Sequence, residues 1–388
     1  MPVGERKNLL YGLALPVLGK PTRWTEAETC FLPPDQPDRA NEIGRCLRRQ
    51  RAVGASLSVM RGGRAAETYV AGYARLPRQP VTPDTVFRTA SIAKLAVALL
   101  LMRLEGKGLL DTREDVSETL GFSLRNPLYA DAPITWRHLM SHSSSIVDTP
   151  AYFASFSATT PLSELLHAED LFAPTKPGEA FRYSNLAAGM LGSLLEKKLG
   201  ETLEDIAQRE LFAPLGIKAT FDLSRCDPET LACAYRVLPP QKAPAFDAQR
   251  RLASALPLSR PDWEHHYLLG SGGLYLTSAE LVKLTTPLLE SCDYLTGEQR
   301  QDMQKPLVPY PDEGVKMWHG LGLLIIDDPA VCPAPVLGHQ GFAYGAVNGV
   351  FLCPTSGAAF ALLDSGASEK RKGRLGDINR QLIRLMLP

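Results

Sequence analysis

Alternating apolar and polar positions near the start of the chain predict a β-hairpin. Residues 54–60 and 65–73 are rich in small and β-branched side chains, and the stretch from Ala55 to Val59 alternates strictly. Residues 61–64 (RGGR) separate the two runs, and glycine readily adopts the backbone conformations of tight hairpin turns. We therefore expect two antiparallel strands joined by a short turn.

The C-terminal end shows the same kind of pattern. Apolar runs at residues 349–352 and 358–363 flank the turn sequence PTSG, and residues 377–387 follow helical spacing. A short helical pattern also precedes the first hairpin, with Ile43 and Leu47 on one face and arginines on the other. The two ends therefore predict one sheet domain with helices packed on it.

Between the two ends the pattern is mainly helical and is interrupted by prolines. Its longest apolar run, from Leu186 to Leu199, stops at Gly200. We predict an α/β plus all-α fold with an antiparallel sheet. The expected organisation is an N-terminal extension (1–38), an α/β sheet domain (39–119 and 266–388) and a mainly helical inserted domain (120–265).

Composition narrows the classes of partner. The chain has 388 residues, 45% hydrophobic and 22% charged, with 42 basic and 42 acidic side chains. This balance creates no field that would attract nucleic acid or anionic lipid, so nucleic acid is not expected as a partner. Seven scattered cysteines form no C-x-x-C pair and predict reduced thiols; they are Cys30, Cys46, Cys226, Cys233, Cys292, Cys332 and Cys353.

The N-terminal segment bears on localisation. An apolar stretch from Leu9 to Leu18 follows Arg6 and Lys7, which resembles a secretory signal. It is too short to span a bilayer, contains Pro16 and lacks a small-residue cleavage site. We predict a cytoplasmic protein with no integral membrane segment, with a secreted or periplasmic protein as the alternative.

The most apolar helical pattern carries candidate nucleophilic chemistry at its start. From Ser91 to Glu105 nearly every residue is an apolar helix former, which predicts a buried helix. Lys94 lies three residues after Ser91, so both side chains share one helix face. Burial and the positive end of the helix dipole favour the neutral form of an amine, which can accept a proton from a hydroxyl.

Two later motifs complete an ordered set with this S-x-x-K tetrad. They are Tyr183-Ser184-Asn185 (Y-x-N) and His339-Gln340-Gly341 (H-x-G), each of which occurs once. Together the three motifs resemble the serine β-lactamase and penicillin-binding protein family, in particular its class C β-lactamase, D-Ala-D-Ala carboxypeptidase, D-aminopeptidase and esterase branch. The segment from Leu139 to Ser144 (LMSHSS) is similar to the family's L-L-x-H-T-S sequence.

The resemblance implies roles for individual residues. Ser91 is expected to be the nucleophile, Lys94 its proton acceptor and Tyr183 a second acid/base. It also implies that Asn185 holds the substrate, and that His339 and Gly341 belong to the strand whose next residue, Phe342, completes an oxyanion hole with Ser91. In the sequence-based interpretation, Lys94 and a protonated His339 stabilise a Tyr183 phenolate. No metal or organic cofactor is expected.

This sequence departs from the family pattern at two positions. His339 stands where lactamases and carboxypeptidases usually carry lysine, and histidine is a conditional cation. We therefore expect an ester or peptide-like amide substrate without an obligatory carboxylate. A true β-lactamase or carboxypeptidase, or a penicillin-binding sensor that does not turn over, are the alternatives. Ser145 replaces a frequent glycine, which leaves the shape of that loop open.

Other candidates favour structural roles. His138 and His142 have the spacing of zinc ligands, but no acidic ligand is near in sequence. His265 and His266 are expected to be a solvated or loop pair. The glycine-rich stretch 270–273 lacks the context of a phosphate loop, and Thr277 with Glu280 predicts a capping box. Trp318 is expected at the start of a core strand.

Overall fold

A computed structural model of the chain describes residues 37–388, except 51, 77–78, 157–159, 239–240, 247–250, 290–292, 313, 344, 370 and 372. The apolar stretch from Leu9 to Leu18 lies outside this range, as do Cys30 and Cys292. The five other cysteines are free thiols. None of the helices in the described part of the chain has the length and apolar run needed to cross a bilayer.

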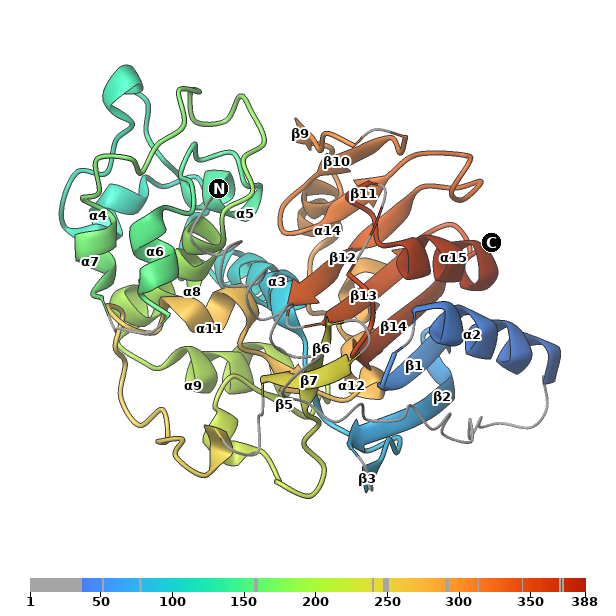
Figure 1. Cartoon of the computed structure of the whole chain (residues 1–388). Helices are drawn as coiled ribbons and strands as arrows, with labels where there is room; N and C mark the ends of the chain where they lie inside the picture. The colour runs from blue at the N-terminus through green and yellow to red at the C-terminus, as the bar shows by residue number, and fades with distance from the viewer. Residues whose placement is uncertain are drawn as a thin grey trace.

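One large antiparallel sheet of nine strands forms one half of the molecule (Figure 1). In spatial order its strands are β3 (Gln79–Pro80), β2 (Arg64–Arg75), β1 (Gly54–Arg61), β14 (Ala358–Ser365), β13 (Ala346–Cys353), β12 (Val336–Ala343), β11 (Leu324–Ile326), β10 (Met317–His319) and β9 (Val308–Pro309). The predicted hairpin is present as β1 and β2, and Gly62 and Gly63 have the positive φ angles (53° and 71°) that its turn requires. Because β1 pairs with β14, the two ends of the chain build one sheet, as the sequence predicts.

The alternation of side chains along the strands buries both faces of this sheet. On β13, Val350 and Leu352 face one core, whereas Phe351 and Cys353 face another. The second core is covered by α2 (Pro37–Gln50) and α15 (Asp377–Met386), which lie side by side on the same face (Figure 1). The first core is shared with the helical half of the molecule.

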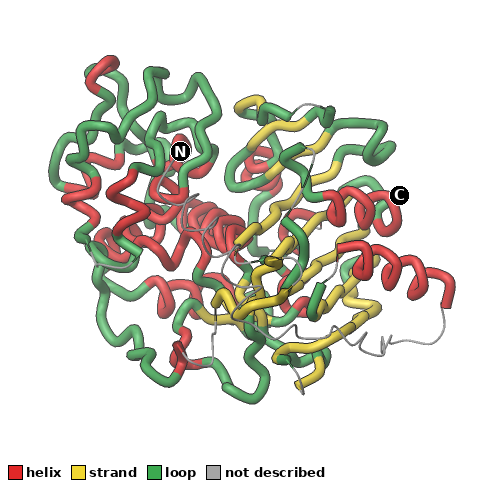
Figure 2. Tube along the Cα trace, viewed as in Figure 1, coloured by secondary structure: helices red, strands yellow, loops and turns green. Residues whose placement is uncertain are grey.

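Helices and loops make up most of the other half (Figure 2). The remaining α-helices are α3 (Ala93–Gly106), α4 (Val116–Leu120), α5 (Trp136–Met140), α6 (Pro150–Ala154), α7 (Leu162–Leu165), α8 (Asn185–Leu199), α9 (Leu203–Ala207), α11 (Tyr267–Gly272), α12 (Ser278–Lys283), α13 (Thr286–Leu289) and α14 (Gly297–Met303). Apart from α8, the helices between residues 120 and 265 are short and joined by loops, because prolines interrupt the helical pattern. The small sheets are β4 (Phe87–Arg88), β8 (Tyr275–Leu276) and β5 (Ala219–Thr220), and β6 (Ala234–Leu238) with β7 (Gln241–Phe246).

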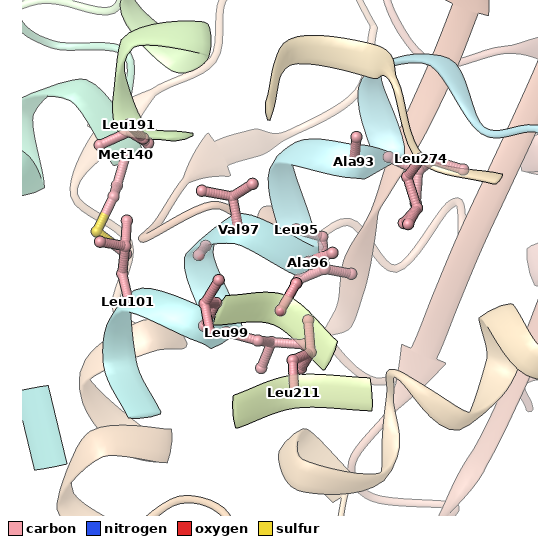
Figure 3. Packing of buried hydrophobic residues seen from close by; sticks show 14 of the residues in the cluster. Ala93, Leu95, Ala96, Val97, Leu99, Leu101, Met140, Leu191, Leu211 and Leu274 are labelled. Atoms are coloured by element: carbon pink, nitrogen blue, oxygen red, sulfur yellow. The ribbon is translucent and has the colours of Figure 1, made fainter. Parts of the chain in front are cut away.

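Helix α3 lies between the two halves and is buried over most of its length. Figure 3 shows Val97, Leu99 and Leu101 packed among Leu191 and Leu211 of the helical half. Full burial of a leucine side chain stabilises a fold by about 1.5–3 kcal/mol relative to exposure. The many buried side chains of α3 therefore hold this helix in place. The residues at its N-terminal end are therefore held in a fixed position beside the sheet.

Candidate active site

A sharp turn presents Ser91 at the start of α3. Strand β4 leads into a 3-10 turn over Ala90–Ile92, in which Ala90 has a φ of 53°. A non-glycine residue seldom adopts this left-handed conformation, which costs about 1–3 kcal/mol and persists only where the surroundings impose it. The strained turn exposes part of Ser91 to a pocket, while Ala90 and Ile92 are buried.

Lys94 lies one helical turn behind Ser91 and is only 4% exposed. Its Nζ atom is 3.1 Å from Ser91 Oγ, 3.0 Å from Asn185 Oδ1 and 2.6 Å from the main-chain oxygen of Ser271. The last two atoms can only accept hydrogen bonds, so Nζ donates to both. The remaining direction around the nitrogen points toward the serine hydroxyl.

The electrostatic environment favours the neutral form of Lys94. Burial lowers its pKa to about 7, although the nearby negative charge of Asp148 opposes the shift. A neutral amine that donates two hydrogen bonds keeps one lone pair, which the geometry places toward Ser91. Ser91 can therefore donate its proton to Lys94 near neutral pH.

Tyr183 contacts the same hydroxyl as Lys94. Its phenol donates a 2.8 Å hydrogen bond to Ser91 Oγ. Burial raises the pKa of Tyr183, and the hydrogen bond to Ser91 only partly opposes this shift. In the free protein the proton relay therefore runs from a protonated Tyr183 through Ser91 to a neutral Lys94.

Asp148 anchors the Tyr183-Ser184-Asn185 segment. Its carboxylate accepts hydrogen bonds from the Ser184 hydroxyl (2.9 Å), the Asn185 side-chain amide (2.8 Å) and the main-chain N–H of Leu186 (2.9 Å). Because a carboxylate only accepts, the bond to Asn185 fixes which end of that amide faces Lys94. Sequence analysis missed Asp148, which belongs to no motif, and it gave the glycine-rich stretch that contains Ser271 only a structural role.

His142 packs against the ring of Tyr183. The two ring centroids are 4.4 Å apart, and the main-chain N–H of Ser184 donates to His142 Nδ1 (3.3 Å). Burial lowers the pKa of His142 well below its usual value, so the ring is neutral. Its φ of 54°, and that of 64° at Ser145, show that this loop keeps left-handed positions without glycine, which settles the loop shape that the sequence left open.

Strand β12 packs against the turn over Ala90–Ile92, which holds Ser91. A Cβ atom at Gly341 would lie 2.5 Å from the Thr89 oxygen and 3.1 Å from the Ser91 nitrogen, so only glycine allows this approach. Strand β11 pairs with β12 only as far as Gly338. The following edge of β12 therefore faces the pocket, where Phe342 is part of the wall.

His339 is neutral, contrary to the charged form that the sequence interpretation invoked. Burial lowers its pKa well below the usual value, and the nearby His319 and Lys94 add to the effect. Its Nδ1–H donates to the oxygen of Gln340 (2.8 Å), which leaves Nε2 as an acceptor. His339 therefore does not supply a positive charge for a Tyr183 phenolate.

These elements enclose a pocket of about 230 Å³ in which the candidate residues meet. Its wall consists of Ser91, Tyr183, Asn185, Tyr310, His319, Leu324, His339, Gln340, Phe342, Arg371 and Arg374. Lys94 lies behind Ser91, and Gly341 supports the turn from β12. The structure thus brings all seven residues singled out in the sequence to one place.

The other sequence candidates lie in structural positions. His138 caps α5, with its Nδ1 accepting the Thr135 N–H (3.2 Å). His265 and His266 lie in the turn before α11, as expected of a loop pair. His265 is exposed beside Asp262, whereas the Nδ1 of His266 lies 2.9 Å from the buried Glu196.

The glycine-rich stretch belongs to α11 and its end. There Gly270 contacts Gly192 of α8, so the small residues serve close helix packing. Thr277 caps α12 through the Glu280 N–H, but Glu280 binds the Lys218 N–H instead of completing a capping box. Trp318 lies in the middle of β10, outside the pocket wall.

Comparison with known proteins places these observations in a family. The family model described as Beta-lactamase matches residues 39–384. The chain is 26% identical to the esterase EstB of Burkholderia gladioli over 362 residues, which cover 85% of this chain and 90% of that protein. It is also 27% identical to the D-alanyl-D-alanine-carboxypeptidase/endopeptidase AmpH of Escherichia coli (strain K12) over 65% of this chain.

The match to some relatives is partial. It spans 62% of AmpH and 33% of a penicillin-binding protein of Bacillus subtilis (strain 168). Among solved structures, a D-amino acid amidase from Ochrobactrum anthropi SV3 superposes with a TM-score of 0.70 at 24% identity, covering 90% of this chain and 97% of that chain. This likeness concerns the fold, which is the antiparallel sheet with flanking helices that the sequence predicts.

Proposed function

Since the chain belongs to the β-lactamase family, we propose that it is a serine hydrolase that forms an acyl-enzyme on Ser91 with an ester or amide substrate. One observation carries this proposal: Ser91 Oγ lies within hydrogen-bond distance of both Lys94 Nζ and the Tyr183 phenol at the wall of one pocket. A hydroxyl becomes a useful nucleophile when an adjacent base takes its proton.

The proposed reaction has two steps. Lys94 takes the proton of Ser91 as Oγ attacks the carbonyl carbon, and the main-chain N–H groups of Ser91 and Phe342 hold the oxyanion. Tyr183 then gives its own proton to the leaving group, and the proton that Lys94 took from Ser91 passes to Tyr183, so that Lys94 is neutral again. Water attacks the acyl-enzyme and releases the acid. Asn185, held by Asp148 and Lys94, lines the pocket where the acyl group is bound.

The neutral state of His339 supports an ester or peptide-like amide over a β-lactam. A β-lactam holds its carboxylate rigidly beside the scissile bond, and an uncharged, buried His339 offers that carboxylate no cation. Among the relatives, EstB is an esterase and the Ochrobactrum protein is a D-amino acid amidase. Both names describe carbonyl substrates of the proposed kind.

Covalent labelling tests the acyl-enzyme directly. Intact-mass spectrometry after treatment with a fluorophosphonate should show one adduct per chain, and peptide mapping should place it on Ser91. Labelling of another residue, or none under conditions that label EstB, would remove the nucleophile from the proposal. A burst of ester cleavage without steady turnover would favour the sensor alternative.

A substrate panel tests the substrate class. We expect kcat/KM for the best short acyl ester or D-amino acid amide to exceed that for nitrocefin at least about tenfold, because recognition of the lactam carboxylate lacks a cation at position 339. Initial rates with equal enzyme concentrations decide the comparison. Efficient turnover of nitrocefin alone would instead identify a β-lactamase.

A further inference from the structure

The inner wall of the pocket has acceptors but no permanent cation. His319 and His339 each donate their Nδ1–H to a main-chain oxygen, at 2.9 Å and 2.8 Å, so each keeps Nε2 as an acceptor. Burial lowers the pKa of His319 to about 4, and His339 is neutral as well. The inner wall therefore offers no cation to a carboxylate that lies beside the reacting carbonyl.

Two arginines change the charge of the pocket at its exposed rim. Arg371 and Arg374 come from the segment before α15, and both are exposed and line the pocket. The Arg371 guanidinium lies 3.9 Å from the ring centre of Phe342, and that of Arg374 lies 5.5 Å from the ring centre of Tyr310. Stacking on aromatic rings restricts these planar groups and keeps their N–H donors at the pocket.

Neither guanidinium belongs to an ion pair in the described part of the chain. Among the residues of that part, no carboxylate lies within 4.0 Å of either guanidinium. The Asp312 carboxylate accepts the main-chain N–H groups of Arg374 (2.7 Å) and Leu375 (3.3 Å). Two permanent cations thus face the same pocket as Ser91.

We propose that Arg371 and Arg374 form a subsite for a carboxylate carried by the ester or amide substrate at a distance from its reacting carbonyl. Guanidinium groups bind carboxylates through paired N–H donors, and Arg keeps its charge at every pH at which Lys94 is neutral. This inference rests on the proposed function. It means that the substrate carboxylate is bound by the segment before α15 and not by a cation at position 339 on β12. The preferred substrate is therefore a flexible acidic ester or amide.

Matched substrates test this subsite. One pair varies the acyl arm (4-nitrophenyl hexanoate against 4-nitrophenyl hydrogen adipate), and the other varies the leaving group (phenyl acetate against 3-carboxyphenyl acetate). In the wild type, kcat/KM should favour the anionic member of at least one pair. In Arg371→Gln/Arg374→Gln that anionic-to-neutral ratio should fall about tenfold, as expected for loss of hydrogen bonds to a charged group.

The control is Arg45→Gln/Arg49→Gln, which removes the same charge from exposed positions on α2 and should leave the ratio unchanged. Raising the salt concentration from about 0.05 to about 0.5 M should lower the wild-type ratio without any substitution, because exposed charges are screened. Equal ratios in the wild type and the pocket variant would overturn the subsite. Absence of Ser91-dependent turnover of every ester would instead overturn the proposed function.

Discussion

Lys94→Met should lower kcat/KM for an ester at least about a hundredfold, toward the level of Ser91→Ala. Methionine fills the buried space but has no lone pair for the serine proton, and a positioned general base contributes about 10²–10⁴ to rate. Lys197→Met is a matched control, since Lys197 also donates to a main-chain oxygen (Leu120, 2.7 Å) but lies on α8 away from the pocket. Steady-state kinetics of the two purified variants make the comparison.

The pH dependence of kcat/KM in the wild type tests the role of Lys94 independently. Because the pKa of Lys94 is lowered to about 7, the amine is protonated and inactive below that pH and neutral above it. We expect kcat/KM, which reports the free enzyme, to rise with pH through about 7 and then level off. A flat profile from pH 5 to 9, or near-normal rates in Lys94→Met, would remove Lys94 from the mechanism.

Tyr183→Phe should also reduce kcat/KM at least about a hundredfold. The substitution keeps the ring beside His142 but removes the only phenol that donates to Ser91 within the described residues, and with it the proton for the leaving group. Because a poor leaving group needs that proton most, the loss should be larger for amides than for 4-nitrophenyl esters. Rates measured on one substrate of each kind test this order.

Tyr267→Phe is the control for loss of a buried phenol. Tyr267 donates to the Thr160 oxygen (2.9 Å) and lies on α11 outside the pocket wall. We expect this variant to melt at a lower temperature but to retain most of its turnover. If both tyrosine variants lost activity to the same extent, the effect at Tyr183 would be structural and its role in proton transfer would be rejected.

Most of the fold and part of the candidate site could be predicted from patterns among neighbouring residues. The hairpin, α8 and α15 follow from periodicity and from glycines at their ends, and these features depend on neighbouring residues only. The spacing of Ser91 and Lys94 on an apolar helix likewise indicates a neutral amine, and the lowered pKa of Lys94 agrees with that prediction. Tyr183 and Asn185 could be connected to them only through the family motif.

The parts of the site that could not be predicted depend on contacts between segments that are far apart in the sequence. The Ser271 carbonyl reaches the site because α11 packs closely on α8, where a Cβ at Gly189 would lie 1.9 Å from the Tyr267 oxygen, and Asp148 reaches it from the loop before α6. Glycines in both helices were the available signal, and the sequence does not say which partner they approach. The sequence left the charge of His339 conditional for the same reason, since the burial that keeps its ring neutral becomes visible only when β12 and α3 are placed together.

The contact of Gly341 with the turn before Ser91 fixes the position of the nucleophile independently of the side chains that select the substrate. Main-chain atoms of β12 and of the nucleophile turn touch there without an intervening side chain, so the spacing between serine and strand does not depend on any rotamer. Of the rim residues described above, Tyr310, Arg371 and Arg374 belong to other segments, and only Phe342 is part of β12. Substitutions of the rim side chains can therefore change which compounds are cleaved. The distance between Ser91 and β12, and with it the placement of the reacting atoms, stays the same.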